Sequence, residues 1–309
     1  MEILITGGCG FIGTNLVNRL LSQPEVERIR TLDNYVTGLR RSDKNERVLE
    51  IAGDLRNYED VLHATEGVDA VVHLGALPSV PRSIKDPRST NAVNIDGTLN
   101  VLEAARANEV KHVSVASSSS VYGANPTLPK IESLATLPLS PYAVTKLATE
   151  AYTNAYSTSY GLKTIAFRFF NVFGPLQRAD HVYAAVIPKF LAALKNREPL
   201  IIFGDGEQSR DFTSIHAVTD ALTKSALRSV TSETPVNLAF GTRTSLNGVV
   251  SLLQELHDRP IEVQYVDPRA GDVKHSQASS ERLTSLLPDV MQPSFVEALK
   301  EVYDWYMTA

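Results

Sequence analysis

The feature that most restricts the fold of this chain is a buried strand that runs directly into a glycine turn and a helix. Residues 2–6 form a short, continuous apolar run, which is typical of a strand buried on both faces. Gly7, Gly10 and Gly13 follow at intervals of three, and apolar residues then recur at helical spacing from Asn15 to Leu21. Such a turn brings the backbone close to a pyrophosphate at a helix N-terminus. The segment therefore predicts a dinucleotide-binding α/β fold.

Strands and helices continue to alternate beyond this turn. Strands are predicted at Arg28–Leu32, Glu50–Ala52, Ala70–Leu74, His112–Ala116 and Thr164–Phe170, and a helix at Asn94–Ala107. This alternation indicates a parallel sheet with crossover helices. After residue 170 the loops lengthen and the helices become short. We therefore predict a doubly wound, Rossmann-type sheet in residues 1–170 and a smaller C-terminal α/β domain in residues 171–309, with the chain crossing back to the first domain.

A carboxylate at the end of the second predicted strand indicates which dinucleotide is bound. Asp33 lies about twenty residues past Gly13, where an acidic side chain accepts both adenosine ribose hydroxyls and repels a 2′-phosphate. NAD is therefore favoured over NADP. Arg40 and Arg41 follow in the same loop and leave NADP open, and an Asp that only begins a turn before Asn34 is the structural alternative.

The amino-acid composition and the net charge exclude several other classes of protein. The hydrophobic share of 43% and the charged share of 21% are ordinary for a soluble globular chain. A formal charge of −5 argues against a nucleic-acid partner. Seven His and one Cys offer no credible zinc or disulfide framework, so no metal is expected. The apolar start leads straight into glycines, so we expect neither a signal peptide nor a membrane span, and a cytoplasmic location.

A tyrosine and a lysine four residues apart form a candidate acid–base pair. Pro141 begins a segment without a helix breaker before Gly161, so Tyr142 and Lys146 should share one helix face with Cβ atoms roughly 5–6 Å apart. A charge about 4 Å away is worth roughly 4 kcal/mol at an effective dielectric of about 20. We expect it to lower the pKa of the phenol from about 10 toward neutrality, where a general base works best. By itself the pair is weak evidence for a catalytic site, because Tyr-x-x-x-Lys also occurs on solvated helix faces.

A serine run lies where the sheet should bind its ligand. Ser117–Ser120 follows the predicted strand His112–Ala116, and ligands of open parallel sheets bind outside the carboxyl ends of the strands. Serines also commonly punctuate strand ends. Arg178, Arg210 and Arg269 occur in the later loops and could clamp phosphates, although each alone is an ordinary surface arginine.

Together these motifs resemble the extended short-chain dehydrogenase/reductase family over essentially the whole chain. The residues that carry the resemblance are Thr6–Gly13, Asp33, Asp54-Leu55, Ser118, Tyr142-x-x-x-Lys146 and Arg168–Pro175. Within the family the sequence is most similar to nucleotide-sugar 4-epimerases, and among them to the bacterial UDP-N-acetylglucosamine 4-epimerases. That likeness depends on four segments, Ser79–Ser83, Leu139–Lys146, Tyr183–Lys189 and Arg269–Ser276.

The resemblance implies NAD lying across the glycine turn and a catalytic set of three residues. Tyr142, as phenolate, would take the proton of the sugar 4-hydroxyl while C4 passes hydride to NAD, and the 4-keto sugar would turn over before the hydride returns. Lys146 would lower the pKa of Tyr142 and hold the nicotinamide ribose, and Ser118 would hydrogen-bond the 4-oxygen. The implied cofactor-binding residues are Gly7, Gly10, Phe11, Ile12, Gly13, Asp33, Asn34, Asp54, Leu55, Leu74, Gly75, Ala76, Asn94, Tyr142 and Lys146.

The resemblance also implies a UDP-sugar substrate. The implied substrate-binding residues are Ser79, Arg82, Ser118, Ser119, Ser120, Asn171, Val186, Lys189, Arg210, Arg269, Asp272 and Ser276. In the epimerases the position of Ser276 gates the pocket beside the 2-substituent, and a small residue admits an N-acetyl group. UDP-GlcNAc and UDP-GalNAc are therefore expected, together with UDP-Glc and UDP-Gal. Arg82 and Lys189 could also meet a uronate, so UDP-glucuronate stays open.

Other activities of the same fold are less consistent with the residues. A 4,6-dehydratase carries Asp-Glu in place of Ser119 and Ser120, because it needs a carboxylic acid and a carboxylate that hydroxyls cannot replace near neutral pH. The related decarboxylases carry Glu at the position of Ser120. A non-catalytic dinucleotide-binding regulator would typically lose the tyrosine or the lysine, and a net-redox dehydrogenase would accumulate NADH. From the likeness alone we also expect a homodimer through helices near 96–108 and 143–159.

Overall fold

A seven-stranded parallel sheet forms the centre of the molecule. The structure is a computed structural model, and it describes residues 1–180, 184–268 and 274–308. The strands of the large sheet, in spatial order, are β11 (Val236–Leu238), β6 (Thr164–Phe169), β5 (His112–Ser118), β4 (Ala70–His73), β1 (Glu2–Thr6), β2 (Arg28–Asp33) and β3 (Val48–Ala52). Every neighbouring pair runs parallel. The predicted Rossmann-type fold is therefore confirmed.

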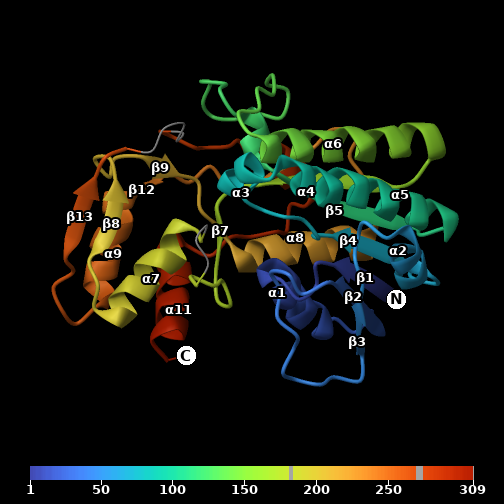
Figure 1. Ribbon diagram of the computed structural model, residues 1–309, viewed down its shortest axis with the longest axis horizontal. Coiled ribbons are helices and arrows are strands. Elements are labelled where there is room, and N and C mark those ends of the chain that lie inside the picture. The colour runs from blue at the N-terminus through green and yellow to red at the C-terminus, as the bar shows by residue number, and fades with distance from the viewer. Residues whose placement is uncertain (181–183, 269–273, 309) are drawn as a thin grey trace.

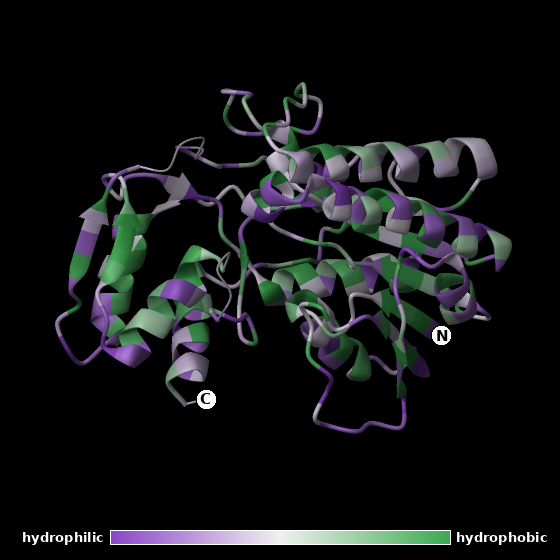
Figure 2. Cartoon of the chain, viewed as in Figure 1, coloured by the Kyte–Doolittle hydropathy of each residue, from purple (hydrophilic) through white to green (hydrophobic). Residues whose placement is uncertain are grey.

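Helices cover both faces of this sheet (Figure 1). One face carries α1 (Phe11–Leu21), α8 (Ile215–Arg228) and α10 (Glu281–Leu286), and the other carries α2 (Tyr58–Thr65), α5 (Gly97–Ala107) and α6 (Pro141–Tyr160). The inner strands β1, β4, β5 and β6 are buried on both faces, and β4 is buried at every residue (Figure 2). Burial on two faces explains why these strands appear in the sequence as continuous apolar runs instead of alternating ones.

The C-terminal half builds a second apolar core from shorter elements. Three two-stranded ladders pair β7 (Val172–Phe173) with β10 (Thr213–Ser214), β8 (Leu200–Phe203) with β13 (Val263–Val266), and β9 (Ser209–Arg210) with β12 (Thr244–Ser245). The helices of this half are α7 (Val186–Asn196), α9 (Leu246–Leu256) and α11 (Phe295–Thr308). Phe173, Phe190 and Phe212 lie in this core. The proposed domain boundary at residue 170 stays a prediction.

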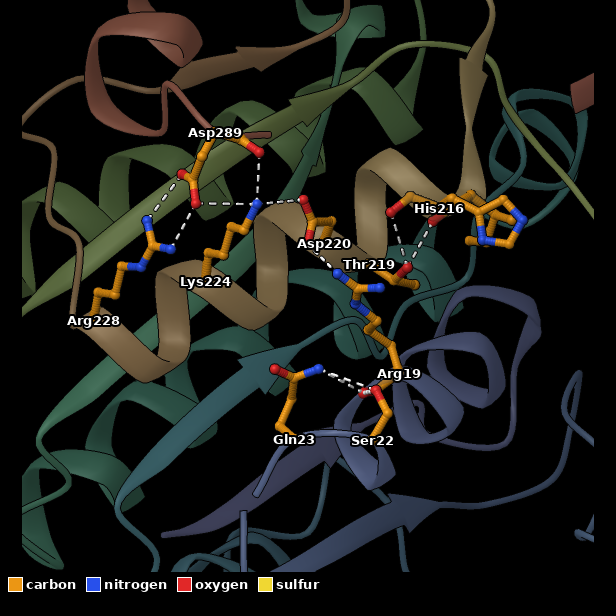
Figure 3. Close-up of polar contacts among 10 residues, drawn as sticks. Arg19, Ser22, Gln23, His216, Thr219, Asp220, Lys224, Arg228 and Asp289 are labelled. Carbon is orange, nitrogen blue, oxygen red and sulfur yellow. Dashed lines mark hydrogen bonds and ion pairs between the residues drawn. The ribbon is translucent and has the colours of Figure 1, made fainter. Parts of the chain in front are cut away.

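Part of the C-terminal half returns to the large sheet, and α8 is its main anchor. Arg19 of α1 pairs with Asp220 of α8 at 2.5 Å, and Lys224 pairs with Asp220 at 2.7 Å (Figure 3). Arg228 makes two bonds to Asp289, at 2.9 and 2.7 Å. These ion pairs lie at the surface, where solvent screens them, so they contribute little to stability. The larger contribution comes from the buried apolar face of α8 against β1, β4 and β6.

Several predicted boundaries differ from the structure. The helix predicted from Asn94 begins with a π-helical turn at Ala92–Asp96, and α5 follows. The strand predicted to end at Ala116 continues to Ser118, because β6 extends alongside it and pairs its last two residues. Within the described residues, no helix has both the length and the apolar character needed to cross a membrane.

Candidate active site

The glycine turn after β1 brings the backbone and the N-terminus of α1 into close contact. Gly7 has a φ of 67°, which favours glycine. A Cβ on Gly13 would lie 2.4 Å from the Gly7 carbonyl oxygen, so α1 can start this close to the turn only without a side chain there. Gly10 provides no side-chain cap, which leaves the first N–H groups of α1, including those of Phe11 and Ile12, for an anionic ligand. The turn therefore fits a dinucleotide pyrophosphate.

Carboxylates at the ends of β2 and β3 form the neighbouring part of the cofactor site. Asp33 is the last residue of β2, and its carboxylate accepts the N–H groups of Cys9 at 3.0 Å and Tyr35 at 2.8 Å. Asn34 donates its side-chain amide to Asp54 at 3.1 Å. Hydrogen bonds, from Arg56 above all, hold the pKa of Asp54 well below its usual range. Asp54 is therefore ionised, and both side chains are fixed beside the glycine turn.

The chain after β4 passes close to the same turn at residues 74–76. A Cβ on Gly75 would lie 2.6 Å from Cδ1 of Leu55, which explains the small residue there. Asn94 is only 1% exposed. Its side chain accepts the N–H of Leu77 at 2.8 Å and donates to the Thr145 hydroxyl at 3.0 Å. Asn94 thus joins this loop to α6.

The three residues predicted to carry the chemistry meet at the carboxyl end of β5. Tyr142 is the second residue of α6, whose start is capped by Ser140. Ser118, at the last position of β5, lies beside Tyr142, and its side chain acts to lower the pKa of the phenol. Lys146 follows one turn later, and its Nζ donates to the carbonyl oxygen of Ala116 at 2.7 Å. A phenol, a hydroxyl and an ammonium therefore lie together at the edge of the sheet where ligands bind.

The pKa of Tyr142 departs from its usual value in the opposite direction to the one expected. Burial raises the pKa of Tyr142, and the Ser118 hydrogen bond only partly opposes that rise. Burial also lowers the pKa of Lys146 to about 8, against the effect of Glu150. The reason is that both groups are buried, which penalises the charged form of each, and that the ammonium is directed at the Ala116 carbonyl.

The serine run forms a short 3-10 turn, Ser119–Tyr122, beside this group. The Ser118 side-chain oxygen accepts the N–H of Ser120 at 3.2 Å. The Ser120 hydroxyl is buried and has no hydrogen-bond partner among the described residues. In the segment that follows β4, Ser79 caps α3 (Val80–Lys85) by accepting the N–H of Arg82 at 3.1 Å.

A cavity of about 280 Å³ opens in the C-terminal half. Four of the predicted substrate-binding residues line it, namely Asn171, Val186, Lys189 and Arg210. Asn171 has a φ of 35° and donates its side-chain amide to the carbonyl of Asp211 at 3.0 Å, which holds this strained residue in place. The cavity also has lining residues that the sequence did not reveal, namely Gln177, Phe190, Phe203, Gln208 and Phe212. Phe203 directly precedes the loop sequence Gly204-Asp205-Gly206, and Phe212 directly follows Arg210-Asp211; this proximity was the signal that the sequence offered.

Of the remaining predicted residues, the structure describes Ser276, which lies beside β9. The Ser276 N–H donates to the carbonyl of Ser209 at 3.0 Å, so Ser276 runs beside Arg210 without being among the described lining residues of the cavity. Arg269 and Asp272 lie outside the described residues. The structure thus brings together one group at β5 and α6 and a second group around the cavity.

Comparison with known families identifies the chain. Residues 3–239 match the model of the NAD dependent epimerase/dehydratase family. The chain belongs to this family. As a member it is an enzyme with NAD as its cofactor, which agrees with the fit of the glycine turn to a pyrophosphate.

Three relatives of this epimerase/dehydratase cover nearly its full length. A solved UDP-N-acetylglucosamine 4-epimerase from Methanobrevibacter ruminantium, in complex with UDP-N-acetylmuramic acid, is 37% identical with a TM-score of 0.94, covering 99% of this chain and 98% of that one. A UDP-glucose 4-epimerase from Mycolicibacterium smegmatis is 31% identical, covering 99% and 98%. A UDP-glucuronate 4-epimerase from Thermodesulfobacterium geofontis is 31% identical, covering 98% and 95%. The three relatives act on different UDP-sugars.

Proposed function

We propose that this enzyme epimerises C4 of UDP-GlcNAc and UDP-GalNAc with NAD, through a 4-keto sugar, and that it also accepts UDP-Glc and UDP-Gal. The observation that carries the proposal is that the Ser118 side chain lies beside Tyr142, one helical turn from the buried ammonium of Lys146. A hydroxyl and a phenol in contact can share the proton of a sugar hydroxyl. The 4-epimerase relatives support the same reaction class.

Each residue of the group has a role that follows from its place. When bound, NAD supplies the oxidation and re-reduction of C4. Tyr142 takes the proton of the 4-hydroxyl and returns it to the 4-oxygen. Ser118 holds that oxygen and passes the proton, since its hydroxyl already contacts Tyr142. Because burial opposes the phenolate, the positive charge of Lys146 in the same buried group must favour it.

The UDP half of the substrate fits the cavity of the C-terminal half. Arg210 and Lys189 supply positive charge near its lining, which suits a diphosphate. Phe190, Phe203 and Phe212 supply apolar walls for a base and a ribose. We also assign Arg269 and Asp272 to this half on family likeness.

The N-acetyl preference depends on Ser276. Its backbone is tied to Ser209 beside Arg210 and its side chain is small, which supports the proposal that this position admits a 2-acetamido group. Ser119 and Ser120 provide hydroxyls, which supports epimerisation over 4,6-dehydration. UDP-glucuronate is the second candidate, because a relative of similar identity acts on it.

A homodimer is part of the proposal. The outer face of α6 carries Val144, Ala151, Tyr152 and Ala155, which are all exposed. Small and apolar residues at this spacing suit close packing against the same face of a second copy. The cytoplasmic location stays a prediction.

Proton NMR of the purified protein tests the function directly. The protein is incubated separately with UDP-GlcNAc, UDP-Glc and UDP-glucuronate, first without and then with added NAD. Formation of UDP-GalNAc is the expected result. Conversion of UDP-glucuronate alone would keep the reaction class and overturn the substrate. A 4-keto-6-deoxy product would overturn the epimerase, and no product with any sugar would favour a non-catalytic dinucleotide binder.

A further inference from the structure

The catalytic face of α6 carries a third ionisable group whose purpose the proposed reaction leaves open. Tyr142, Lys146 and Glu150 follow one another at intervals of four residues and therefore lie along one face of the helix. The Glu150 side chain is only 4% exposed. An isolated carboxylate buried to this degree is strongly unfavourable, so its partners must be identified.

Three donors from two strands hold the Glu150 carboxylate. Arg168 of β6 donates from Nε at 2.9 Å and from Nη2 at 2.8 Å in a bidentate pair. The Ser117 hydroxyl of β5 donates to the same carboxylate. Arg168 is itself 4% exposed, and its guanidinium also lies 4.7 Å from the centre of the Tyr122 ring. Glu150 is therefore fixed in position from both strands.

Consecutive residues of β5 contact three turns of α6. The Ala116 carbonyl accepts a hydrogen bond from the Lys146 ammonium, the Ser117 hydroxyl donates to Glu150, and the Ser118 side chain lies beside Tyr142. A shift of α6 along β5 would therefore disturb all of these contacts together. Ser117 and Glu150 add a contact on the far side of Lys146 from the chemistry, which fixes the register of the helix.

We propose that Glu150 is a positioning residue of this site, which holds α6 in register on β5 and maintains the positive charge of Lys146. The charged and titratable groups that face Lys146 are Tyr142 and Glu150 on α6 and His73 on β4. His73 stays neutral, since burial lowers its pKa to about 3. Arg168 is paired with Glu150 and partly neutralises its negative charge. Among the described groups, Glu150 is thus the anion that stabilises the ammonium of Lys146.

The test measures the ionisation of Lys146 itself. The NAD-loaded protein is labelled with 13C at lysine Cε, the Lys146 signal is assigned by its loss in Lys146→Met, and its shift is followed against pH. In Glu150→Gln the titration midpoint should fall by about one pH unit or more, because the opposite charge one turn away is lost. The double variant Glu150→Gln/Arg168→Met should shift in the same direction and avoids leaving a lone buried guanidinium.

Ser117→Ala is the matched control, because it removes one contact to Glu150 and changes no charge. Its Lys146 midpoint should stay within about a few tenths of a pH unit of the wild type. An unchanged midpoint in either folded Glu150 variant would overturn the proposal. So would an equal fall in Ser117→Ala.

The activity readout rests on the proposed function and is kept separate. In the Glu150 variants the alkaline limb of the pH–rate profile for UDP-GlcNAc should move to lower pH with the Lys146 midpoint, and KM should stay near the wild-type value because Glu150 is remote from the cavity. A shifted midpoint in a protein that turns over no UDP-sugar would overturn the function and leave the role of Glu150 standing. A wild-type pH–rate profile in a Glu150 variant whose Lys146 titration midpoint has shifted would overturn the proposed role of Glu150.

Discussion

The β5–α6 edge and the C-terminal cavity are built in contrasting ways. At the edge, Tyr142 and Lys146 lie against long parallel strands, where Lys146 donates a hydrogen bond to Ala116 of β5 and Tyr142 lies beside Ser118. The cavity is lined from α7 and from ladders as short as β9 and β12, which have two residues each. The first region is held by a sheet that is buried on both faces, whereas the second depends on loops and on individual side chains.

This difference suggests that the sheet edge determines the reaction, whereas the cavity determines which sugar is accepted. A sheet that is paired on both sides fixes the reacting groups with little freedom to vary, so the 4-epimerase relatives can share one reaction. Side chains on short elements can change without disturbing the core, so the sugar can differ between relatives of similar identity. Four predictions test this division, beginning with the largest effect.

Tyr142→Phe should cause the largest loss. Removing the phenolic hydroxyl removes the proposed base, and we expect kcat to fall by about 10²–10⁴-fold. KM should change little, because the cavity is untouched. The measurement is steady-state epimerisation of UDP-GlcNAc, with circular dichroism to show that the fold is retained. The exposed Tyr265→Phe, which also removes one phenolic hydroxyl, is the control and should keep full activity. A tenth or more of the activity left in Tyr142→Phe would rule out Tyr142 as the base.

Arg210→Met should have the opposite kinetic signature. Arg210 lines the cavity, and a charge-assisted hydrogen bond to phosphate is worth about 1.5–3 kcal/mol. We therefore expect KM for UDP-GlcNAc to rise about 10- to 100-fold, and kcat to change far less. Arg243→Met, an exposed arginine of the same region, is a matched control. Equal losses in kcat and in kcat/KM would show that the two regions do not act separately.

The sequence predicts the two regions unequally for a physical reason. Gly7, Gly10 and Gly13 follow a buried strand, and local sterics require glycine there, so the pattern is visible in the chain. Tyr142 and Lys146 share a helix, so their spacing alone predicts that they are neighbours. The cavity is different, because Phe190 and Phe212 look like ordinary core residues until tertiary packing brings them together.

The pKa of Tyr142 shows where spacing stops being informative. Four-residue spacing places Lys146 beside Tyr142 but does not say how deeply either is buried. Burial penalises both charged forms, and the Ala116 carbonyl receives the ammonium. The error therefore came from the electrostatics of the folded state, since both residues lie where they were expected.

Ser276→Tyr should change selectivity and leave the catalytic edge intact. A large ring beside Arg210 would fill the space proposed for the acetamido group, and overpacking costs about 1–3 kcal/mol. We expect kcat/KM for UDP-GlcNAc to fall at least about 10-fold, with UDP-Glc nearly unchanged. Ser276→Ala is the control and should keep both activities. An equal loss for both sugars in competition assays would contradict the assignment of the gate.

The smallest effect concerns acid stability of the sheet region, through His73. Its ring contacts the Thr6 hydroxyl at 2.7 Å and the Thr98 hydroxyl at 3.0 Å, and burial lowers its pKa to about 3. The unfolded chain therefore binds a proton near its ordinary pKa of about 6.5 that the folded chain does not bind. The stability linked to this group is present above about pH 6.5 and is lost as the pH falls toward about 3.

Between about pH 7.5 and about pH 5, this linkage should lower the free energy of unfolding by about 2 kcal/mol. His73→Gln should remove that part of the slope even if it also weakens the protein at neutral pH. Urea unfolding at both pH values measures it. His63→Gln, at an exposed position of α2, is the matched control and should keep the wild-type slope. If His73→Gln kept the full slope as well, the acid sensitivity would belong to groups other than the buried histidine behind the cofactor turn.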